Sequence, residues 1–199
     1  MDFHVSEIAE ISGCFLLQNL PNLDDRGWFR DIVRTPVLPA QVSKEFTMEQ
    51  VSVSCSAPGV VRGLHFSVVT CDASFYQLVS CVGGHVLDGL VDVRVGSPTF
   101  GAAFQMELTP DSGAALLMPP GVAHGYRSLQ HGSTLVYAMS RSFPQAKTQG
   151  IRADFPGLGL WRQDDWASTI SWRDRELPTF EAALDSGLLP EMPDASRAG

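Results

Sequence analysis

Basic residues are scarce in this chain. Lysine and arginine together number 14 against 22 aspartates and glutamates, so the formal net charge at pH 7 is −8. Proteins that bind nucleic acids or anionic membranes in general need a basic face, and this composition argues against both kinds of partner. It leaves room for one phosphorylated ligand that a few local arginines hold.

Long apolar segments are also missing. No run reaches the roughly 18 residues of a membrane-spanning helix, and the first 20 residues lack the basic start and apolar stretch of a signal peptide. The four cysteines are Cys14, Cys55, Cys71 and Cys81, and none forms a CxxC pair. We therefore expect a cytoplasmic protein whose cysteines are buried small hydrophobic residues rather than disulfides.

The rest of the composition is typical of one β-rich domain. The chain has 199 residues, 44% of them hydrophobic, and its 18 glycines and 13 prolines can supply many turns. We expect a single domain over residues 1–188. Residues 189–199 contain two prolines and several small polar residues, which indicates a flexible tail.

Short apolar segments separated by turn residues predict many strands. These segments cover residues 46–56, 60–66, 76–82, 85–95, 104–108, 114–118 and 134–140. Such close spacing indicates an antiparallel sandwich or barrel. Residues 175–186 carry the best helical pattern and residues 36–45 a shorter one. The predicted fold class is therefore all-β, a jelly roll with small flanking helices.

One segment combines two functional side chains in a strand-like context. Residues 59–66 read GVVRGLHF, with Arg62 and His65 three positions apart. Side chains alternate between faces along a strand, so these two share a face only if Gly63 bends the backbone. Three further blocks are DRGWF at residues 25–29, VDVRVGSPTFG at residues 91–101 and PPGVAHGY at residues 119–126.

In order and spacing, the four blocks resemble the dTDP-4-dehydrorhamnose 3,5-epimerase family, over roughly residues 20–180. The resemblance implies a cupin-type jelly-roll barrel and a homodimer with exchanged N-terminal strands. It also implies a dTDP-linked 4-keto-6-deoxyhexose as substrate, epimerised at C3, C5 or both in deoxysugar biosynthesis, without a cofactor.

Epimerisation next to a ketone needs a base on one face of the sugar and an acid on the other. His65 suits the base, because the ordinary imidazole pKa of about 6.5 lies near working pH. The resemblance implies that Asp174 orients His65 and that Tyr137 is the acid, an uncharged donor at neutral pH. Taken alone, each of these residues has a structural alternative. His65 can be a polar residue at the barrel mouth, Asp174 an acid at a helix N-terminus, and Tyr137 a core aromatic.

A set of substrate-binding residues also follows from the resemblance. Arg62 and Arg26 are candidate diphosphate ligands, since a guanidinium contacts phosphate oxygens bidentately, and Arg26 is expected to reach the partner subunit's nucleotide. The alternative for both is an ordinary ion pair. The remaining candidates are Phe143, stacked on the base; His124, with Asp88 as its buried partner; and Phe29, Gln50, Gln77 and Arg173.

We expect no metal. His124 follows a Pro-Pro-Gly turn that resembles the second cupin motif, where metal cupins place a ligand histidine. The first block, however, lacks the His-x-His pair, because Ser67 stands where the second histidine is required. A first-row metal site needs at least about three such ligands.

The chain departs from the family pattern at the group that should hold the ketone oxygen. Gln77 stands where the family has a lysine, Met48 stands at a usual glutamine, and the loop over residues 67–74 is longer. These changes favour the branch that makes unusual deoxysugars for secondary metabolites, whose members can epimerise one carbon only. Two rival hypotheses stay open: a keto-isomerase that uses His65, and a non-catalytic cupin that binds sugar nucleotides.

Overall fold

Two antiparallel sheets form the body of the protein. The computed structural model describes residues 2–68, 75–142, 148–153, 156–161 and 169–192. The first sheet has the order β1-β2-β10-β7-β12-β5. Its strands are β1 (His4–Glu7), β2 (Phe15–Gln18), β10 (Ala114–Met118), β7 (Gln77–Gly83), β12 (Ser133–Met139) and β5 (Gln50–Ser56).

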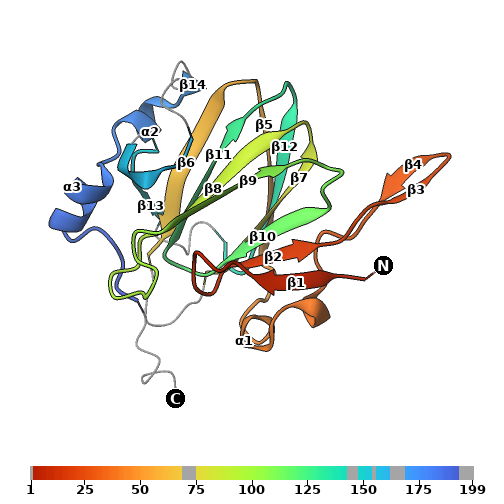
Figure 1. The fold of residues 1–199 in the computed structure, drawn as a ribbon, viewed down its shortest axis with the longest axis horizontal. Coiled ribbons are helices and arrows are strands. Elements are labelled where there is room, and N and C mark those ends of the chain that lie inside the picture. Colours follow the sequence, from red (N-terminus) through yellow and green to blue (C-terminus); the bar gives the residue numbers. More distant parts are fainter. Residues whose placement is uncertain (1, 69–74, 143–147, 154–155, 162–168, 193–199) are drawn as a thin grey trace.

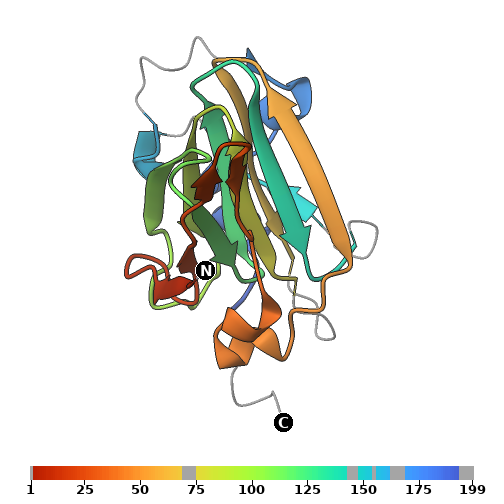
Figure 2. The ribbon, with the colours of Figure 1, turned by 90° about the vertical axis from the view of Figure 1, so that its right-hand side faces the viewer.

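The second sheet lies opposite the first, so the two form the layers of a sandwich (Figures 1 and 2). Its order is β13-β6-β11-β8-β9, and β14 pairs in parallel with β6 at the edge. The strands are β13 (Thr148–Gly150), β6 (Val60–Ser67), β11 (Val122–Ser128), β8 (Val86–Asp92), β9 (Ala103–Leu108) and β14 (Thr169–Ile170).

Apolar side chains from both sheets meet in the space between them. This core includes Val79 of β7, Leu116 of β10, Leu90 of β8 and Leu135 of β12, each fully buried. Two further clusters cover the outer faces. One packs α3 (Phe180–Asp185) and residues 151–153 and 158–161 on the second sheet, and the other packs α1 (Ala40–Ser43) on the first.

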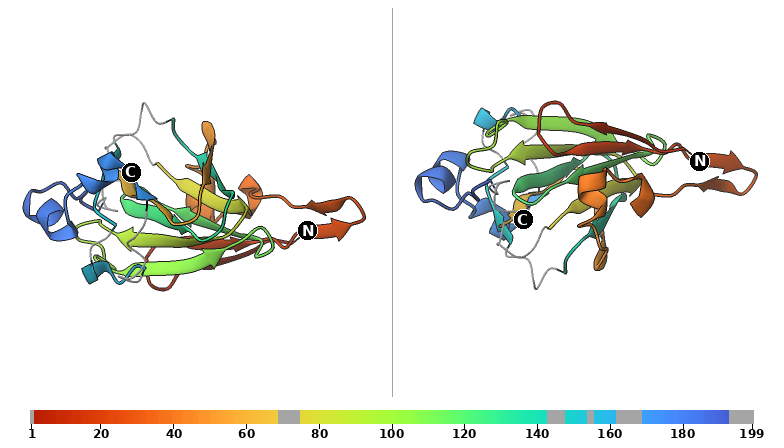
Figure 3. Two further views of the ribbon diagram at one scale, coloured as in Figure 1. Left: turned by 90° about the horizontal axis from the view of Figure 1, so that it is seen from above. Right: turned by 90° about the horizontal axis from the view of Figure 1, so that it is seen from below.

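A two-stranded hairpin stands apart from the sandwich. It consists of β3 (Asn22–Asp24) and β4 (Gly27–Phe29) and extends beyond the sheets at the end opposite α3 (Figure 3). Its apolar side chains are exposed, with Leu23 at 78% and Phe29 at 63% of their accessible area. A short 3₁₀ helix, η1 (Thr35–Val37), follows it and leads into α1.

The all-β jelly-roll prediction is confirmed, although no described strand of one sheet pairs with a strand of the other, so the sandwich is not a closed barrel. All seven predicted strands exist, β10 with the predicted bounds and the others with shifted ends. The strands that were missed are β1, β2, β3, β4, β11, β13 and β14. The predicted helix over residues 175–186 is wrong as a single element. It is divided into α2 (Trp172–Arg175) and α3, because Pro178 disfavours helical backbone before it and Thr179 caps a new start.

The C-terminal segment and the cysteines also differ in part from expectation. Residues 189–192, predicted to begin a flexible tail, pair with Val95, whose N–H donates to Pro190 O and whose carbonyl accepts from Met192 N. Residues 193–199 lie outside the described residues, as does Cys71. Cys14 and Cys81 are buried free thiols, whereas Cys55 is exposed. Within the described ranges, no helix is long and apolar enough to cross a membrane.

Candidate active site

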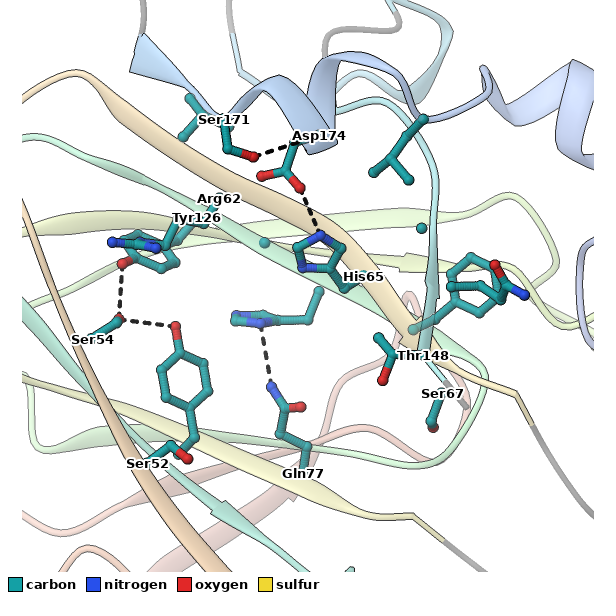
Figure 4. Close-up of a pocket in the computed structure, with 18 of the residues that line it drawn as sticks. Ser52, Ser54, Arg62, His65, Ser67, Gln77, Tyr126, Thr148, Ser171 and Asp174 are labelled. Atoms are coloured by element: carbon teal, nitrogen blue, oxygen red, sulfur yellow. Dashed lines mark hydrogen bonds and ion pairs between the residues drawn. The ribbon is translucent and has the colours of Figure 1, made fainter. Parts of the chain in front are cut away.

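A cavity of about 900 Å³ opens between the two sheets (Figure 4). Both sheets and the segment around α2 contribute to its wall. Seven of the predicted site residues line it, namely His65, Asp174, Tyr137, Arg62, His124, Gln77 and Arg173. Its size is that of cavities that hold small organic ligands.

Arg62 and His65 reach this cavity together because β6 is irregular at Gly63. This glycine has φ +104°, and a Cβ there would lie 2.6 Å from the carbonyl oxygen of His124 on β11. The pairing with β11 shifts at this point, so that His65 opposes His124 while Arg62 opposes Tyr126. Two residues of β6, Gly63 and Leu64, therefore stand opposite one residue of β11, Gly125, and the strict alternation of side chains is broken.

His65 forms a hydrogen-bonded pair with Asp174. The distance from His65 Nε2 to Asp174 Oδ1 is 2.8 Å, and the carboxylate is nearly buried while the imidazole is about half exposed (Figure 4). Burial alone raises the pKa of Asp174, but hydrogen bonds from His65, Ser171 and the Gly63 backbone lower it below the ordinary 3.8. The pair leaves Nδ1 of His65 free to accept a proton.

The chain brings Asp174 to His65 across 109 positions. Strand β14 runs parallel to the start of β6, with Thr169 opposite Val60 and Ile170 opposite Val61. Ser171 then caps α2 by accepting a hydrogen bond from Asp174 N at 3.1 Å. The carboxylate thus sits in the first turn of a short helix whose start is fixed against β6.

A second histidine–carboxylate pair lies deeper in the cavity wall. His124 Nε2 lies 2.9 Å from Asp88 Oδ2, and the Asp88 side chain is fully buried. Burial raises the pKa of Asp88, and the neighbouring His124 opposes this rise. On the other side of the ring, Nδ1 of His124 lies 3.5 Å from the Gln77 amide nitrogen. The pair therefore holds the Gln77 amide at the cavity wall.

Tyr137 faces the same cavity from β12. Its ring stands edge-on to His124, with the ring centroids 6.1 Å apart. Burial raises the pKa of Tyr137, as does the nearby Tyr126, so the phenol is protonated at neutral pH. Its oxygen lies 3.2 Å from Ser54 Oγ.

Three predicted residues are not brought to the cavity in this single chain. Arg26 and Phe29 lie on the exposed hairpin, where Arg26 pairs with Asp24. Gln50, at the start of β5, donates to Ser52 Oγ at 2.8 Å and is not among the lining residues. Phe143 lies outside the described residues.

Sequence reasoning missed several polar lining residues, above all Tyr126, Ser54 and Ser52. A signal for them exists in the period of two along a strand. Tyr126 stands two positions after His124, and Ser52 and Ser54 alternate with the exposed Val51 and Val53.

Metal ligands in sufficient number do not converge in the part of the chain that the structure describes. There, no group of three or more His, Cys, Asp or Glu side chains is arranged to hold an ion.

Comparison with known proteins agrees with this geometry. The family model described as dTDP-4-dehydrorhamnose 3,5-epimerase matches residues 8–182. This chain belongs to that family. The match confirms the carbohydrate-epimerase class and the resemblance that the four sequence blocks carry.

Relatives of the family include enzymes of both specificities. The dTDP-4-dehydrorhamnose 3,5-epimerase of Mycobacterium tuberculosis is 33% identical over 190 residues, which covers 94% of this chain and 93% of the relative. The dTDP-4-dehydro-6-deoxyglucose 3-epimerase of Streptomyces bikiniensis is 31% identical over 180 residues, or 90% and 91% of the two chains.

A solved structure of the family has the same fold. NovW, a 4-keto-6-deoxy sugar epimerase from the novobiocin gene cluster of Streptomyces spheroides, superposes with a TM-score of 0.86 at 30% identity. The superposition covers 96% of this chain and 94% of NovW.

Asp174 should make the stability of this epimerase-family chain depend on pH. Its pKa is lower in the folded state than in the unfolded state, so its charge stabilises the fold above the ordinary value of 3.8. That contribution is lost as the pH falls through the lower folded value. The free-energy difference between wild type and Asp174→Asn should therefore be largest near neutral pH and shrink below pH 3.8, as measured by urea unfolding at a series of pH values.

A matched control is Asp185→Asn, which removes an exposed carboxylate from α3. It should change the unfolding free energy by less than about 0.5 kcal/mol. An Asp174→Asn deficit of the same size at every pH would show that the ion pair does not stabilise the fold.

Proposed function

We propose that this chain epimerises a dTDP-linked 4-keto-6-deoxyhexose at a carbon next to the ketone, with His65 as base and Tyr137 as acid. The observation that carries the proposal is their arrangement. A carboxylate-paired histidine and a protonated tyrosine line one cavity in a chain of this epimerase family. A protein that only binds sugar nucleotides needs no such pair.

The first step is removal of the proton from carbon. Asp174 accepts the Nε2–H of His65, which leaves the Nδ1 lone pair to take the proton. The electrons of the broken C–H bond form a C–C double bond, and the ketone oxygen becomes an oxyanion. Asp174 also stabilises the imidazolium that results, because its charge lies 2.8 Å away.

The second step returns a proton to the opposite face. Tyr137 is protonated at neutral pH because burial raises its pKa. The Tyr137 O–H bond breaks as the new C–H bond forms, and the ketone is restored. Inversion at that carbon follows because base and acid approach from different sides.

The Gln77 amide is the proposed donor to the oxyanion. His124 Nδ1 accepts one amide hydrogen, and the second is available for the ketone oxygen. Arg62 and Arg173 supply positive charge at the cavity for the diphosphate. The solved structure of the Streptomyces bikiniensis 3'-monoepimerase ChmJ holds dTDP-quinovose, which supports a nucleotide sugar as the ligand here.

We further propose that the active form is a homodimer that exchanges its N-terminal strands. The β3–β4 hairpin exposes the cross-strand pair Leu23 and Trp28 to solvent, and Arg26 and Phe29 lie on it without lining the active-site cavity. A partner subunit would cover this apolar surface and receive Arg26 at its nucleotide. The cytoplasmic location stays a prediction.

Replacing Leu23 and Trp28 by serine should therefore separate the subunits and abolish activity. Sedimentation equilibrium should show dimers for the wild type and monomers for the double variant. The control Leu184→Ser removes an exposed leucine from α3 and should leave the dimer intact. A wild type that sediments as a stable, active monomer would refute the exchange.

Proton NMR in D₂O tests the reaction itself. With dTDP-4-keto-6-deoxyglucose, wild type should incorporate deuterium at C3, C5 or both and invert at least one of them. His65→Asn should abolish incorporation at every carbon. Tyr137→Phe should lose inversion by about 10²-fold or more while deuterium still enters, because removing an acid typically costs 10²–10⁴-fold. No exchange with the wild type would reject the proposal, and a moved carbonyl would indicate a keto-isomerase.

Gln77 is expected to limit the reaction at the less reactive carbon. A neutral amide stabilises an enolate less than an ammonium does in a site shielded from water. Gln77→Lys should raise deuterium exchange at the slower carbon by about tenfold, a part of what one oxyanion donor contributes. The control Gln18→Lys adds the same charge on β2, outside the cavity, and should change neither rate. Equal exchange at C3 and C5 in the unmodified protein would show that Gln77 imposes no restriction.

A further inference from the structure

A continuous line of hydrogen bonds runs from Tyr137 to Arg62 through three hydroxyl groups. Tyr137 Oη lies 3.2 Å from Ser54 Oγ, which lies 2.9 Å from Tyr126 Oη (Figure 4). Tyr126 Oη lies 2.8 Å from Ser56 Oγ, and Ser56 Oγ accepts from Arg62 Nε at 3.1 Å. We call this series the hydroxyl chain. Its members come from β12, β5, β11 and β6, and thus from both sheets.

The arginine end fixes the direction of the hydroxyl chain. A guanidinium donates hydrogen bonds and accepts none, so Ser56 must be the acceptor from Arg62. Ser56 is buried, and among the described residues its own hydrogen has no acceptor other than Tyr126 Oη. Leaving a buried hydroxyl unbonded costs about 1–3 kcal/mol. Ser56 therefore donates to Tyr126.

The direction of donation continues from Ser56 toward Tyr137. The Tyr126 hydroxyl accepts from Ser56 and its side chain is fully buried, so its one hydrogen is donated onward, either to Ser54 Oγ at 2.9 Å or directly to the neighbouring Tyr137 hydroxyl, and Tyr137 is the acceptor at the end of both routes. Ser54 then donates its own hydrogen to Tyr137 Oη. Tyr137 is thus an acceptor within the hydroxyl chain, and its own O–H hydrogen is not used there.

We propose that Ser54, Tyr126 and Ser56 are positioning residues that, with Arg62, aim the Tyr137 O–H at the substrate carbon. The inference rests on the proposed role of Tyr137 as the acid. When the Tyr137 O–H bond breaks and the new C–H bond forms, the phenolate oxygen keeps the hydrogen bond from Ser54. No proton moves along the hydroxyl chain in this step.

Two observations support the assignment. Burial raises the pKa of Tyr137 and the neighbouring Tyr126 adds to that rise, whereas the hydrogen bond with Ser54 works against it, as a donor to the phenolate should. Arg62 is also the candidate diphosphate ligand, so the group that fixes the direction lies where the substrate is recognised. Hydroxyl networks of this kind strengthen cooperatively, because each bond polarises the next.

The test separates proton removal from proton return. In D₂O, an enolate that the acid cannot protonate regains a proton or deuteron from the His65 side, so deuterium enters without inversion. Tyr126→Phe and Ser54→Ala should each lower the inversion rate by about tenfold while changing deuterium incorporation at the same carbon by less than about threefold. Ser54→Thr restores a hydroxyl and should recover most of the inversion.

Tyr76→Phe is the matched control. It removes a phenolic oxygen outside the cavity, next to the apolar cluster on the outer face of the first sheet. The ratio of incorporation to inversion should be that of the wild type. A merely structural role for Tyr126 would lower both rates together and leave this ratio unchanged, which would overturn the proposal.

Tyr137→Phe distinguishes failure of the proposed mechanism from failure of the hydroxyl chain alone. If it retains inversion, Tyr137 is not the acid, and the proposed mechanism and the hydroxyl chain both fail. If it loses inversion while Tyr126→Phe and Ser54→Ala keep the wild-type ratio, only the hydroxyl chain fails. Should Tyr126→Phe not fold, Ser54→Ala decides, because it removes a single oxygen from a half-buried position on an edge strand.

Discussion

The close approach of three backbones in the second sheet is the constraint on which the cavity depends. A Cβ on Gly63 would lie 2.6 Å from His124 O, one on Gly125 2.6 Å from Arg62 O, and one on Gly150 2.7 Å from Leu64 O. Only glycine, which has no Cβ, fits these contacts. The backbones of β6, β11 and β13 can therefore approach one another this closely because glycine stands at positions 63, 125 and 150. The same irregularity turns the imidazole of His65 and the guanidinium of Arg62 toward one cavity and aims the Gly63 N–H at Asp174.

Local patterns in the sequence predicted most of the architecture, and their failures have physical causes. Alternation identified β5, because one of its faces is exposed along most of its length. It missed β11, whose residues are buried on both sides by the inner core and by the outer cluster of the second sheet, so no polar face marks it. The helix over residues 175–186 was drawn through Pro178 because its apolar spacing continues on both sides of the proline.

The residues of the candidate site also fall into two groups, those that the sequence could predict and those that it could not. His65, Arg62 and His124 stand in compact motifs, so their shared context could be read from the sequence. Asp174 could be paired with His65 only through a family resemblance, since nothing local links positions so far apart. The roles of Tyr126 and Ser54 depend on which hydroxyl donates each hydrogen bond, which only the atomic positions can show. Arg26 and Phe29 lie on an exposed hairpin and do not line the active-site cavity of the same chain.

The parallel attachment of β14 to the start of β6 has a consequence for how the protein is made. A ribosome adds His65 early and Asp174 109 residues later, after every strand of the sandwich has been synthesised. The sheets can therefore assemble on the nascent chain before the carboxylate exists. A product that terminated shortly before residue 169 would retain both sheets of the sandwich, but its His65 would lack the Asp174 carboxylate.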